Sequence, residues 1–343
     1  MTGSQFHLQA HVDDLYANGP RRLALRAQTP HEFELWRAAL RQAISHLLGI
    51  AGRTPPRSVQ AVHLTSTDQG AYVEKKFALD VGESVSAPAY VLVPKGEPPY
   101  KPVLVFHGHN PSVQYILGNY PDPDTADHWR ALDNNYAQRL AEAGYLVGVI
   151  AQRGFGERLS DQVIEAETFH SACRQLSFEY LLHGRTMLGE RIWDALHLLS
   201  FIRARADVVP GVMGCTGNSG GGTTTLWLAA LDDRITVAVP YCYFCSFKHS
   251  ILGVQHCECN YVPGILTLAE MGDLAALIAP RPVRFIAGEH DPLFPIAATR
   301  QQFDTVQRAY DLLDAGERCS LAVHPDEHRY DVALSRAWFD RWL

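Results

Sequence analysis

The pentapeptide at 217–221, Gly-Asn-Ser-Gly-Gly, constrains this chain more than any other segment because it has the pattern G-x-S-x-G. An apolar run at 208–213 precedes it, and a helix-like stretch at 223–231 follows it. In a strand–turn–helix context of this kind the serine occupies a strained turn, and the flanking glycines leave room for the neighbouring backbone. Ser219 is therefore predicted to be a nucleophile. The pattern alone is short enough to arise by chance, so the prediction depends on partner residues elsewhere in the chain.

An acid and a histidine that follow Ser219 in the chain have the order expected of such partners. A serine hydroxyl needs a base that accepts its proton, and the base needs an acid that holds it in the correct tautomer. Where the serine lies on a turn of this type, the chain order is serine, acid, histidine. Asp291 follows the predicted strand 283–287, and His328 follows the next predicted strand, 320–323. We expect Ser219, Asp291 and His328 to form the catalytic group.

Other residues in the same loops compete for these roles. His324 lies nearer its strand than His328, but His328 directly precedes the terminal helix, from where a side chain can reach back over the sheet edge. Glu289 is expected to end its strand or to face solvent. The acidic pair at 326–327 lies too close in sequence to His328 to orient it from a separate loop. The prediction therefore keeps Asp291 as the acid and His328 as the base.

An oxyanion hole is the third requirement, because negative charge develops on the carbonyl oxygen in the tetrahedral intermediate. The backbone N–H of Gly220, directly after the serine, is one expected donor. The loop after the predicted strand 102–106 reads His-Gly-His-Asn-Pro, and we assign the second donor to the N–H of His109. A purely structural role for Gly108, as the residue that turns the chain, is the alternative.

Several charged residues are interpreted as structural. Arg153 is expected to tie loops together through an ion pair rather than to contact substrate. Arg185, Glu190 and Asp194, around a predicted helix at 190–205, are expected to cap the helix or to form salt bridges.

Residues 1–57 are expected to form an N-terminal helical extension. Thr29 and Glu32 fit a capping box, and apolar residues then recur at helical spacing. A proline pair at 55–56 breaks the pattern. The catalytic domain is therefore expected to span 58–343.

This domain begins with three strand-like segments and continues with strands that alternate with helices. Such alternation predicts right-handed crossovers and an α/β fold, with a mostly parallel sheet and helices on both of its faces. The expected strands lie at 59–64, 71–81, 87–93, 102–106, 145–150, 212–215, 235–239, 283–287 and 320–323. The expected helices of the domain lie at 129–143, 190–205, 223–231, 297–313 and 332–342.

Two segments, 155–188 and 243–279, are too long for simple connections between a strand and a helix. Both leave the predicted sheet at the carboxyl ends of strands, where α/β sheets bind ligands. They are expected to form the wall and roof of a substrate pocket, in which Tyr243 and Phe244 would restrict the acyl group to short chains.

Composition excludes several classes of protein. The formal net charge is −7, and no Lys/Arg cluster forms a basic stripe, which argues against nucleic-acid binding. The sequence has neither a basic and apolar leader nor an apolar run long enough to cross a bilayer. We expect a cytoplasmic protein with no nucleic-acid or membrane partner, and its assembly into a homo-oligomer is left open.

The seven cysteines are an odd number in a chain of this size, which argues against a disulfide scaffold. Cys242, Cys245, Cys257 and Cys259 could supply soft ligands for zinc. The aromatic residues around Cys242 and Cys245 favour buried thiols instead. The sequence therefore predicts no metal and no other cofactor, and a zinc hydrolase remains an alternative.

Further short motifs accompany the pentapeptide, at 107–109, 153–157, 184–186, 257–261, 291–295 and 328–330. Together they resemble α/β hydrolases of the acetyl xylan esterase and dienelactone-hydrolase-like group, over roughly residues 58–343. The resemblance implies an eight-stranded sheet, a Ser219–Asp291–His328 triad without a cofactor, and hydrolysis of carboxylic esters, often acetyl esters.

The chain departs from this family pattern at two places. An acidic pair occupies 326–327, where a glycine-rich pair often precedes the family histidine. Gly220 stands where deacetylases of the cephalosporin and xylan type carry glutamine, so their substrate range does not carry over. Dienelactone hydrolases proper use a cysteine nucleophile, and the serine at 219 argues against their lactone chemistry.

The sequence thus predicts a serine carboxylesterase that acts on a small ester through an acyl-enzyme. An amidase or peptidase on the same fold is one alternative. A hydrolase fold that only binds its ligand, without catalysis, is another. Acyl group, alcohol group and assembly do not follow from the sequence.

Overall fold

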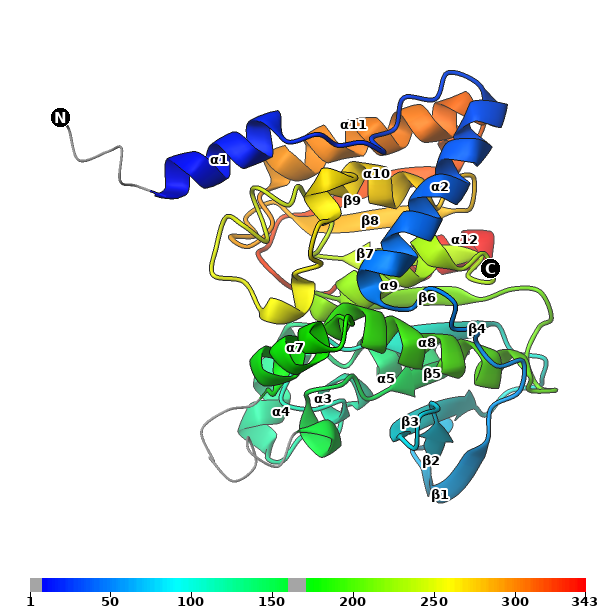
Figure 1. Cartoon of the computed structure of the whole chain (residues 1–343). Helices are drawn as coiled ribbons and strands as arrows, with labels where there is room; N and C mark the ends of the chain where they lie inside the picture. The colour runs from blue at the N-terminus through cyan, green and yellow to red at the C-terminus, as the bar shows by residue number, and fades with distance from the viewer. Residues whose placement is uncertain (1–7, 160–170) are drawn as a thin grey trace.

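The computed structural model describes residues 8–159 and 171–343, and through them runs a nine-stranded sheet (Figure 1). The strands are β1 (Ala61–Asp68), β2 (Tyr72–Asp80), β3 (Ser86–Pro94), β4 (Pro102–Phe106), β5 (Leu146–Ile150), β6 (Gly214–Asn218), β7 (Val237–Tyr241), β8 (Val283–Gly288) and β9 (Cys319–His324). Their order across the sheet is β1-β2-β3-β5-β4-β6-β7-β8-β9. The pairs from β1 to β5 are antiparallel, and those from β5 to β9 are parallel.

The predicted α/β class and mostly parallel sheet are confirmed, but the expected count of eight strands is wrong. Each of the nine strand-like segments of the sequence forms a strand. The antiparallel segments β1 to β3 all join the same sheet through backbone pairing, with one register shift in β1 between His63 and Thr65. β1 is one of the two edge strands, and nearly all of its residues are exposed.

Helices cover both faces of the sheet. The α-helices are α1 (Leu8–Asn18), α2 (Pro30–Leu48), α3 (Gln114–Leu117), α4 (Pro123–Ala131), α5 (Tyr136–Glu142), α7 (Cys173–Leu182), α8 (Met187–Arg203), α9 (Gly220–Leu231), α10 (Met271–Ala276), α11 (Ile296–Leu312) and α12 (Val332–Trp342). The 3-10 helices are η2 (Gly156–Arg158), η3 (Glu258–Asn260), η4 (Ile265–Thr267) and η5 (Gly316–Arg318). One core packs against α8, α9, α10 and α11, and the core on the opposite face packs against α3, α5 and α12.

The expected helix at 129–143 is wrong, because the segment forms the end of α4 and the whole of α5. Leu132 ends α4, and Asp133 adopts a left-handed backbone conformation with φ of 52°. A helix cannot continue through a residue in that conformation. Trp129, on α4, and Asn134, in the turn between α4 and α5, both line the pocket described below.

Helix α2 of the N-terminal extension begins at Pro30, directly after the predicted cap Thr29. The Thr29 side chain accepts a hydrogen bond from the N–H of Glu32, although the Glu32 carboxylate accepts from Gln28 rather than completing a capping box. Phe33, Leu40, Ile44 and Leu48 are fully buried. Figure 1 shows α2, in blue, beside α9, and α2 shares the core formed with α8 and α9. The domain boundary at residue 57 stays a prediction.

The two long insertions differ in how much of them the structure describes. Residues 160–170 of the expected wall at 155–188 lie outside the described residues, whereas the segment 243–279 is described throughout. Residues 1–7 of the expected N-terminal extension also lie outside the described range. Within residues 8–159 and 171–343, none of the helices combines the length and the apolarity that a bilayer crossing requires.

The order β5-β4-β6 makes the centre of the sheet a topological switch point. The chain leaves β4 toward β5 on one side and later returns to β6 on the other. Connections on the two sides diverge at such a point and leave a crevice at the carboxyl ends of the strands. The loop after β4 carries His109, and the turn after β6 carries Ser219, so both residues lie at this crevice.

Candidate active site

Ser219 lies on a strained turn between β6 and α9. Its backbone has φ of 57° and ψ of −119°, a combination that L-residues rarely adopt. The turn passes close to the end of β4: a Cβ atom added at Gly217 would lie 2.4 Å from the carbonyl oxygen of Phe106, and one at Gly221 would lie 2.0 Å from it. Glycine is therefore required at both positions, as the pentapeptide predicts.

His328 and Asp291 form a hydrogen-bonded pair. Nδ1 of His328 lies 2.7 Å from Oδ2 of Asp291. The other carboxylate oxygen of Asp291 accepts hydrogen bonds from the backbone N–H groups of Leu293, at 2.9 Å, and Phe294, at 3.3 Å. Burial acts to raise the pKa of Asp291, but the hydrogen bond and charge of His328 and these two N–H donors outweigh burial and lower it. Asp291 is therefore an anion that can hold the imidazole in one orientation.

Aromatic packing fixes the loop that carries His328. The ring of Tyr330 stacks between Tyr136, at 4.2 Å between centroids, and Tyr241, at 3.9 Å. The Tyr330 hydroxyl lies 2.8 Å from Oγ1 of Thr216 on β6. Stacked rings and a buried hydrogen bond leave this segment little freedom. The loop after β9 is thereby tied to the strand that leads to Ser219.

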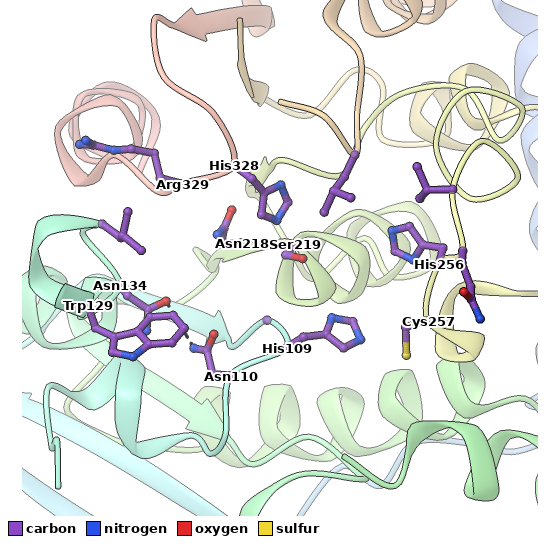
Figure 2. A pocket seen from close by; sticks show the side chains of 15 residues that line it. His109, Asn110, Trp129, Asn134, Asn218, Ser219, His256, Cys257, His328 and Arg329 are labelled. Atoms are coloured by element: carbon purple, nitrogen blue, oxygen red, sulfur yellow. Dashed lines mark hydrogen bonds between the residues drawn. The ribbon is translucent and has the colours of Figure 1, made fainter. Parts of the chain in front are cut away.

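Ser219 and His328 line the same pocket, whose volume is about 420 Å³. Figure 2 shows Ser219 between the side chains of His328 and His109, with His256 and Cys257 beside them. The remaining wall combines amide, aromatic and apolar groups. It consists of Gly108, Asn110, Trp129, Leu132, Asn134, Asn218, Val254, Gln255, Leu293 and Arg329.

The two predicted oxyanion donors lie next to Ser219. A Cβ atom on Gly108 would lie 3.2 Å from the Cβ of Ser219, so the chain just before His109 runs against the serine. Gly220 is the first residue of α9, and its N–H has no carbonyl partner within the helix. Within residues 8–159 and 171–343, neither this N–H nor that of His109 donates to a protein acceptor. Both groups are available to an oxygen atom bound in the pocket.

His107 holds the loop after β4, a role that the sequence reading missed. Its Nε2 atom accepts a hydrogen bond from the N–H of Gln152 at 2.9 Å, so Nδ1 carries the proton and donates to the carbonyl oxygen of Gly108 at 2.8 Å. Burial lowers the pKa of His107 to about 3, so the ring is neutral at physiological pH. The Gln152 side chain bonds both the carbonyl oxygen of His107 and the hydroxyl of Thr224 on α9. The sequence signal for this role was the position of His107, directly after β4 and directly before Gly108.

Tyr243 and Phe244 do not line the pocket beside Ser219, so the prediction that they form the acyl pocket is corrected. The Tyr243 hydroxyl accepts a hydrogen bond from Nε1 of Trp227 at 3.0 Å, and Phe244 packs on Phe285 at 4.2 Å between ring centroids. Both side chains turn into the core because they follow β7 directly and fill the space between the sheet and its helices. Their place at the pocket is taken by residues 254–257 of the same insertion.

The charged residues behave as expected. Arg153 lies 2.8 Å from both Glu190 and Asp194, and all three are buried. Arg185 bonds Glu83 at 2.6 Å. These contacts join the loop after β5 to α8 and confirm the predicted ion-pair role of Arg153.

The four cysteines proposed as zinc ligands do not come together. Cys242 and Cys245 are buried thiols, with Cys245 Sγ against the carbonyl oxygen of Pro295 at 3.7 Å. Cys242 lies near Asp291 and His328, which already bond one another. Cys257 and Cys259 lie elsewhere, beside His109.

Comparisons with known proteins show which family and fold the chain shares. The chain is 30% identical, over 319 residues, to YtaP of Bacillus subtilis (strain 168), a protein provisionally described as a hydrolase; the match covers 90% of this chain and 100% of that protein. No family model matches the chain.

Solved structures show the same fold at low sequence identity. A Bacteroides fragilis NCTC 9343 protein provisionally described as an acetyl xylan esterase matches with a TM-score of 0.80 and 17% identity, over 98% of this chain and 95% of that one. A glucuronoyl esterase from Solibacter usitatus matches with a TM-score of 0.67 and 15% identity, over 93% of this chain and 96% of that one. The chain therefore belongs to the same hydrolase family as YtaP, and it has the α/β-hydrolase fold of these solved structures.

Proposed function

We propose that the protein is a serine carboxylesterase that cleaves short-chain esters, acetyl esters above all, through an acyl-enzyme intermediate. Ser219 Oγ attacks the ester carbonyl carbon while His328 accepts its proton. The tetrahedral intermediate collapses, and His328 returns the proton to the leaving alcohol. Water then attacks the acyl-serine with His328 again as the base, which releases the acid and restores the hydroxyl.

The observation that carries this proposal is the shared pocket of Ser219 and His328, with His328 held by Asp291 at 2.7 Å. Asp291 stabilises the imidazolium that forms when His328 takes the serine proton. The N–H groups of Gly220 and His109 supply the donors for the oxyanion, each worth roughly two to three orders of magnitude in rate. The chemistry uses only groups of this chain.

Two observations support a small acyl group on a polar alcohol. The pocket, at about 420 Å³, lies at the low end of ligand sites, which suits a short ester. Trp129 offers a flat apolar face, and Asn110 and Asn134 offer donors and acceptors beside it, a combination that suits a hydroxylated alcohol such as a sugar. The similar structures include proteins described as acetyl xylan esterase and glucuronoyl esterase, which is consistent with that class of alcohol.

The first test is the hydrolysis of p-nitrophenyl acetate by the wild-type protein and by Ser219→Ala. We expect the variant to lose at least about a thousandfold in kcat with its circular dichroism unchanged, because the methyl group of alanine cannot attack the ester. Ser66→Ala, on the exposed edge strand β1, is the matched control and should keep full activity. Full activity in Ser219→Ala would overturn the assignment.

The acyl-enzyme and the acyl preference need separate measurements. A rapid burst of p-nitrophenol, close to one equivalent per chain, is expected where deacylation is slow. A fluorophosphonate probe should label the wild type and not Ser219→Ala. A series of p-nitrophenyl esters from acetate to octanoate should show kcat/KM falling with chain length, and a maximum at octanoate would contradict the short-chain proposal.

A further inference from the structure

A second cluster of reactive side chains lies beside the pocket. The Nε2 atom of His109 and the Sγ atoms of Cys173, Cys257 and Cys259 all lie within 4.8 Å of one another. Cys259 Sγ is 3.4 Å from His109 Nε2 and 3.2 Å from Cys257 Sγ. Figure 2 shows the His109 ring directed toward Cys257. The four residues come from the loop after β4, the first turn of α7, and the segment that includes η3.

The geometry points to a tetrahedral zinc site with these four side chains as ligands. Three cysteines and one histidine are a ligand set of structural zinc sites, with bonds of about 2.3 Å to sulfur and about 2.0 Å to nitrogen. Tetrahedral angles then place two sulfurs about 3.8 Å apart and a sulfur and a nitrogen about 3.6 Å apart. The two distances given above, 3.2 Å and 3.4 Å, are shorter than these values by about 0.6 Å and about 0.2 Å, differences that side-chain rotations can remove. Sequence spacing alone would not join Cys257 and Cys259 to His109, because His109 lies 150 residues before Cys259 in the chain.

Arg191 on α8 supplies the independent observation. Its side chain is buried, and its guanidinium donates to Cys173 Sγ at 3.1 Å and to the carbonyl oxygen of Arg153 at 2.8 Å. Among residues 8–159 and 171–343, no carboxylate pairs with it. A buried cation without a counter-charge is costly. Zinc with three thiolates and a neutral imidazole carries one net negative charge, which Arg191 balances.

The sulfur atoms also have hydrogen-bond donors of the kind that surround metal-bound thiolates. Besides Arg191, the side-chain amide of Asn260 donates to Cys259 Sγ at 3.5 Å. Asn260 is itself buried and bonded to Thr223 on α9. Arg191 thus holds the sulfur of Cys173, and Asn260 holds the sulfur of Cys259.

A disulfide accounts for the cluster less well. The sulfur atoms of Cys257 and Cys259 are separated by 3.2 Å, far longer than a bond of about 2.05 Å. A disulfide between any two of the cysteines would remove two groups that can become anionic, and it would leave the buried Arg191 facing one thiol. It would also leave the imidazole of His109 without a role. Zinc uses all four groups.

Four protein ligands fill the zinc coordination shell, so this site is structural and has no open position for a reacting water. Zinc would join the loop after β4 to α7 and to η3. It would thereby hold the backbone of His109 against Ser219. This last consequence rests on the proposed oxyanion role of His109, whereas the metal site itself does not.

The test is elemental analysis of the protein purified without added chelator. We expect close to one zinc per chain in the wild type, and less than about a fifth of that in Cys173→Ser and in Cys259→Ser. Cys319→Ser is the matched control, because Cys319 is a buried thiol outside the cluster and its replacement should leave the zinc content unchanged. Cobalt introduced in place of zinc should give sulfur-to-metal charge-transfer absorption that the Cys259→Ser variant lacks.

Other results would overturn the site. Wild-type protein without zinc, in which alkylation under denaturing conditions modifies two fewer than the seven cysteines, would show a disulfide instead. Zinc content equal in the wild type and in both cluster variants would place the metal elsewhere. Because metal content is measured without substrate, loss of esterase activity in Ser219→Ala leaves this test unaffected, and the two proposals can fail separately.

Discussion

Nδ1 of His328 lies 2.7 Å from Oδ2 of Asp291, although 37 residues separate them in the chain. The carboxylate side chain is fully buried, while the imidazole retains 21% of its exposure and reaches the pocket. Two backbone N–H groups, those of Leu293 and Phe294, hold the carboxylate from the other side. The ring of Phe294 also stacks along that of His328, at 5.7 Å between centroids. One loop thus fixes both the anion and the plane of the imidazole.

The arrangement predicts the effect of Asp291→Asn. The amide cannot stabilise the imidazolium and favours the wrong tautomer of His328, so kcat for p-nitrophenyl acetate should fall by about 10³- to 10⁴-fold, with KM changed much less. The rival acids provide the controls. Glu289→Gln and Asp326→Asn, whose side chains are 39% and 48% exposed, should each stay within a few fold of the wild type. A large loss in either control together with an active Asp291→Asn would move the acid to that residue.

The lowered pKa of Asp291 also predicts how stability depends on pH. The unfolded chain has the ordinary aspartate pKa of about 3.9, so it takes up the proton before the folded protein does as the pH falls. The stabilisation is therefore fully present above that pKa and is lost as the pH falls through the lower, folded-state value. Urea unfolding of the wild type and Asp291→Asn should show a difference in free energy at neutral pH that shrinks in this acidic range. A difference that stays constant down to about pH 3 would contradict the shift.

The close approach of β4 to the serine turn predicts the effect of Gly217→Ala. The added methyl group would lie 2.4 Å from the carbonyl oxygen of Phe106 and 2.7 Å from backbone atoms of Gly221. Neither neighbour is a flexible side chain, so the free energy of unfolding should fall by more than about 2 kcal/mol. At Gly96 the nearest atom to an added Cβ is Cε1 of Tyr100, at 3.8 Å, and Gly96→Ala should change stability little. Denaturant unfolding of both variants measures this difference in stability. Equal free energies of unfolding for Gly217→Ala and Gly96→Ala would contradict the prediction.

The packing of α2 predicts that the N-terminal extension stabilises the whole domain. Leu40 is fully buried, whereas Leu35 on the same helix is 61% exposed. Leu40→Ala should therefore lower the free energy of unfolding by about 2 to 5 kcal/mol. Leu35→Ala should change it by less than about 0.5 kcal/mol. Calorimetry that shows a single transition, shifted only in Leu40→Ala, would support one cooperative unit; a separate early transition would support a domain boundary near residue 57.

Some parts of this structure could be predicted from local sequence because they depend on local physics. The strand 102–106 has the predicted bounds, and α12 begins and ends where the sequence predicts. The turn at Ser219 follows from glycine placement, since backbone crowding leaves few alternatives. Ser219, Asp291 and His328 could be placed at one edge of the sheet because each follows a parallel strand, and the carboxyl ends of parallel strands share an edge.

Other parts depend on which segments pack together. A run of aromatic residues does not reveal which rings face the core. Tyr243 and Phe244 were therefore expected at the pocket, but both side chains are buried in the core. The residue that interrupts the expected helix at 129–143, Asp133, has no sequence signature as strong as glycine or proline. The role of His107 required knowledge that Gln152, at the end of β5, lies beside it.

The sequence alone determined the class of fold, the serine turn and the identity of the acid and base candidates, because spacing and backbone sterics act within short segments. Tertiary structure alone decided that Cys173 meets Cys257, Cys259 and His109, and that Arg191 is buried against them. Residues so far apart in the chain are brought together by the packing of α7, α8 and the loop after β4. No periodicity or motif in one segment carries that information, since each segment contributes only part of the cluster.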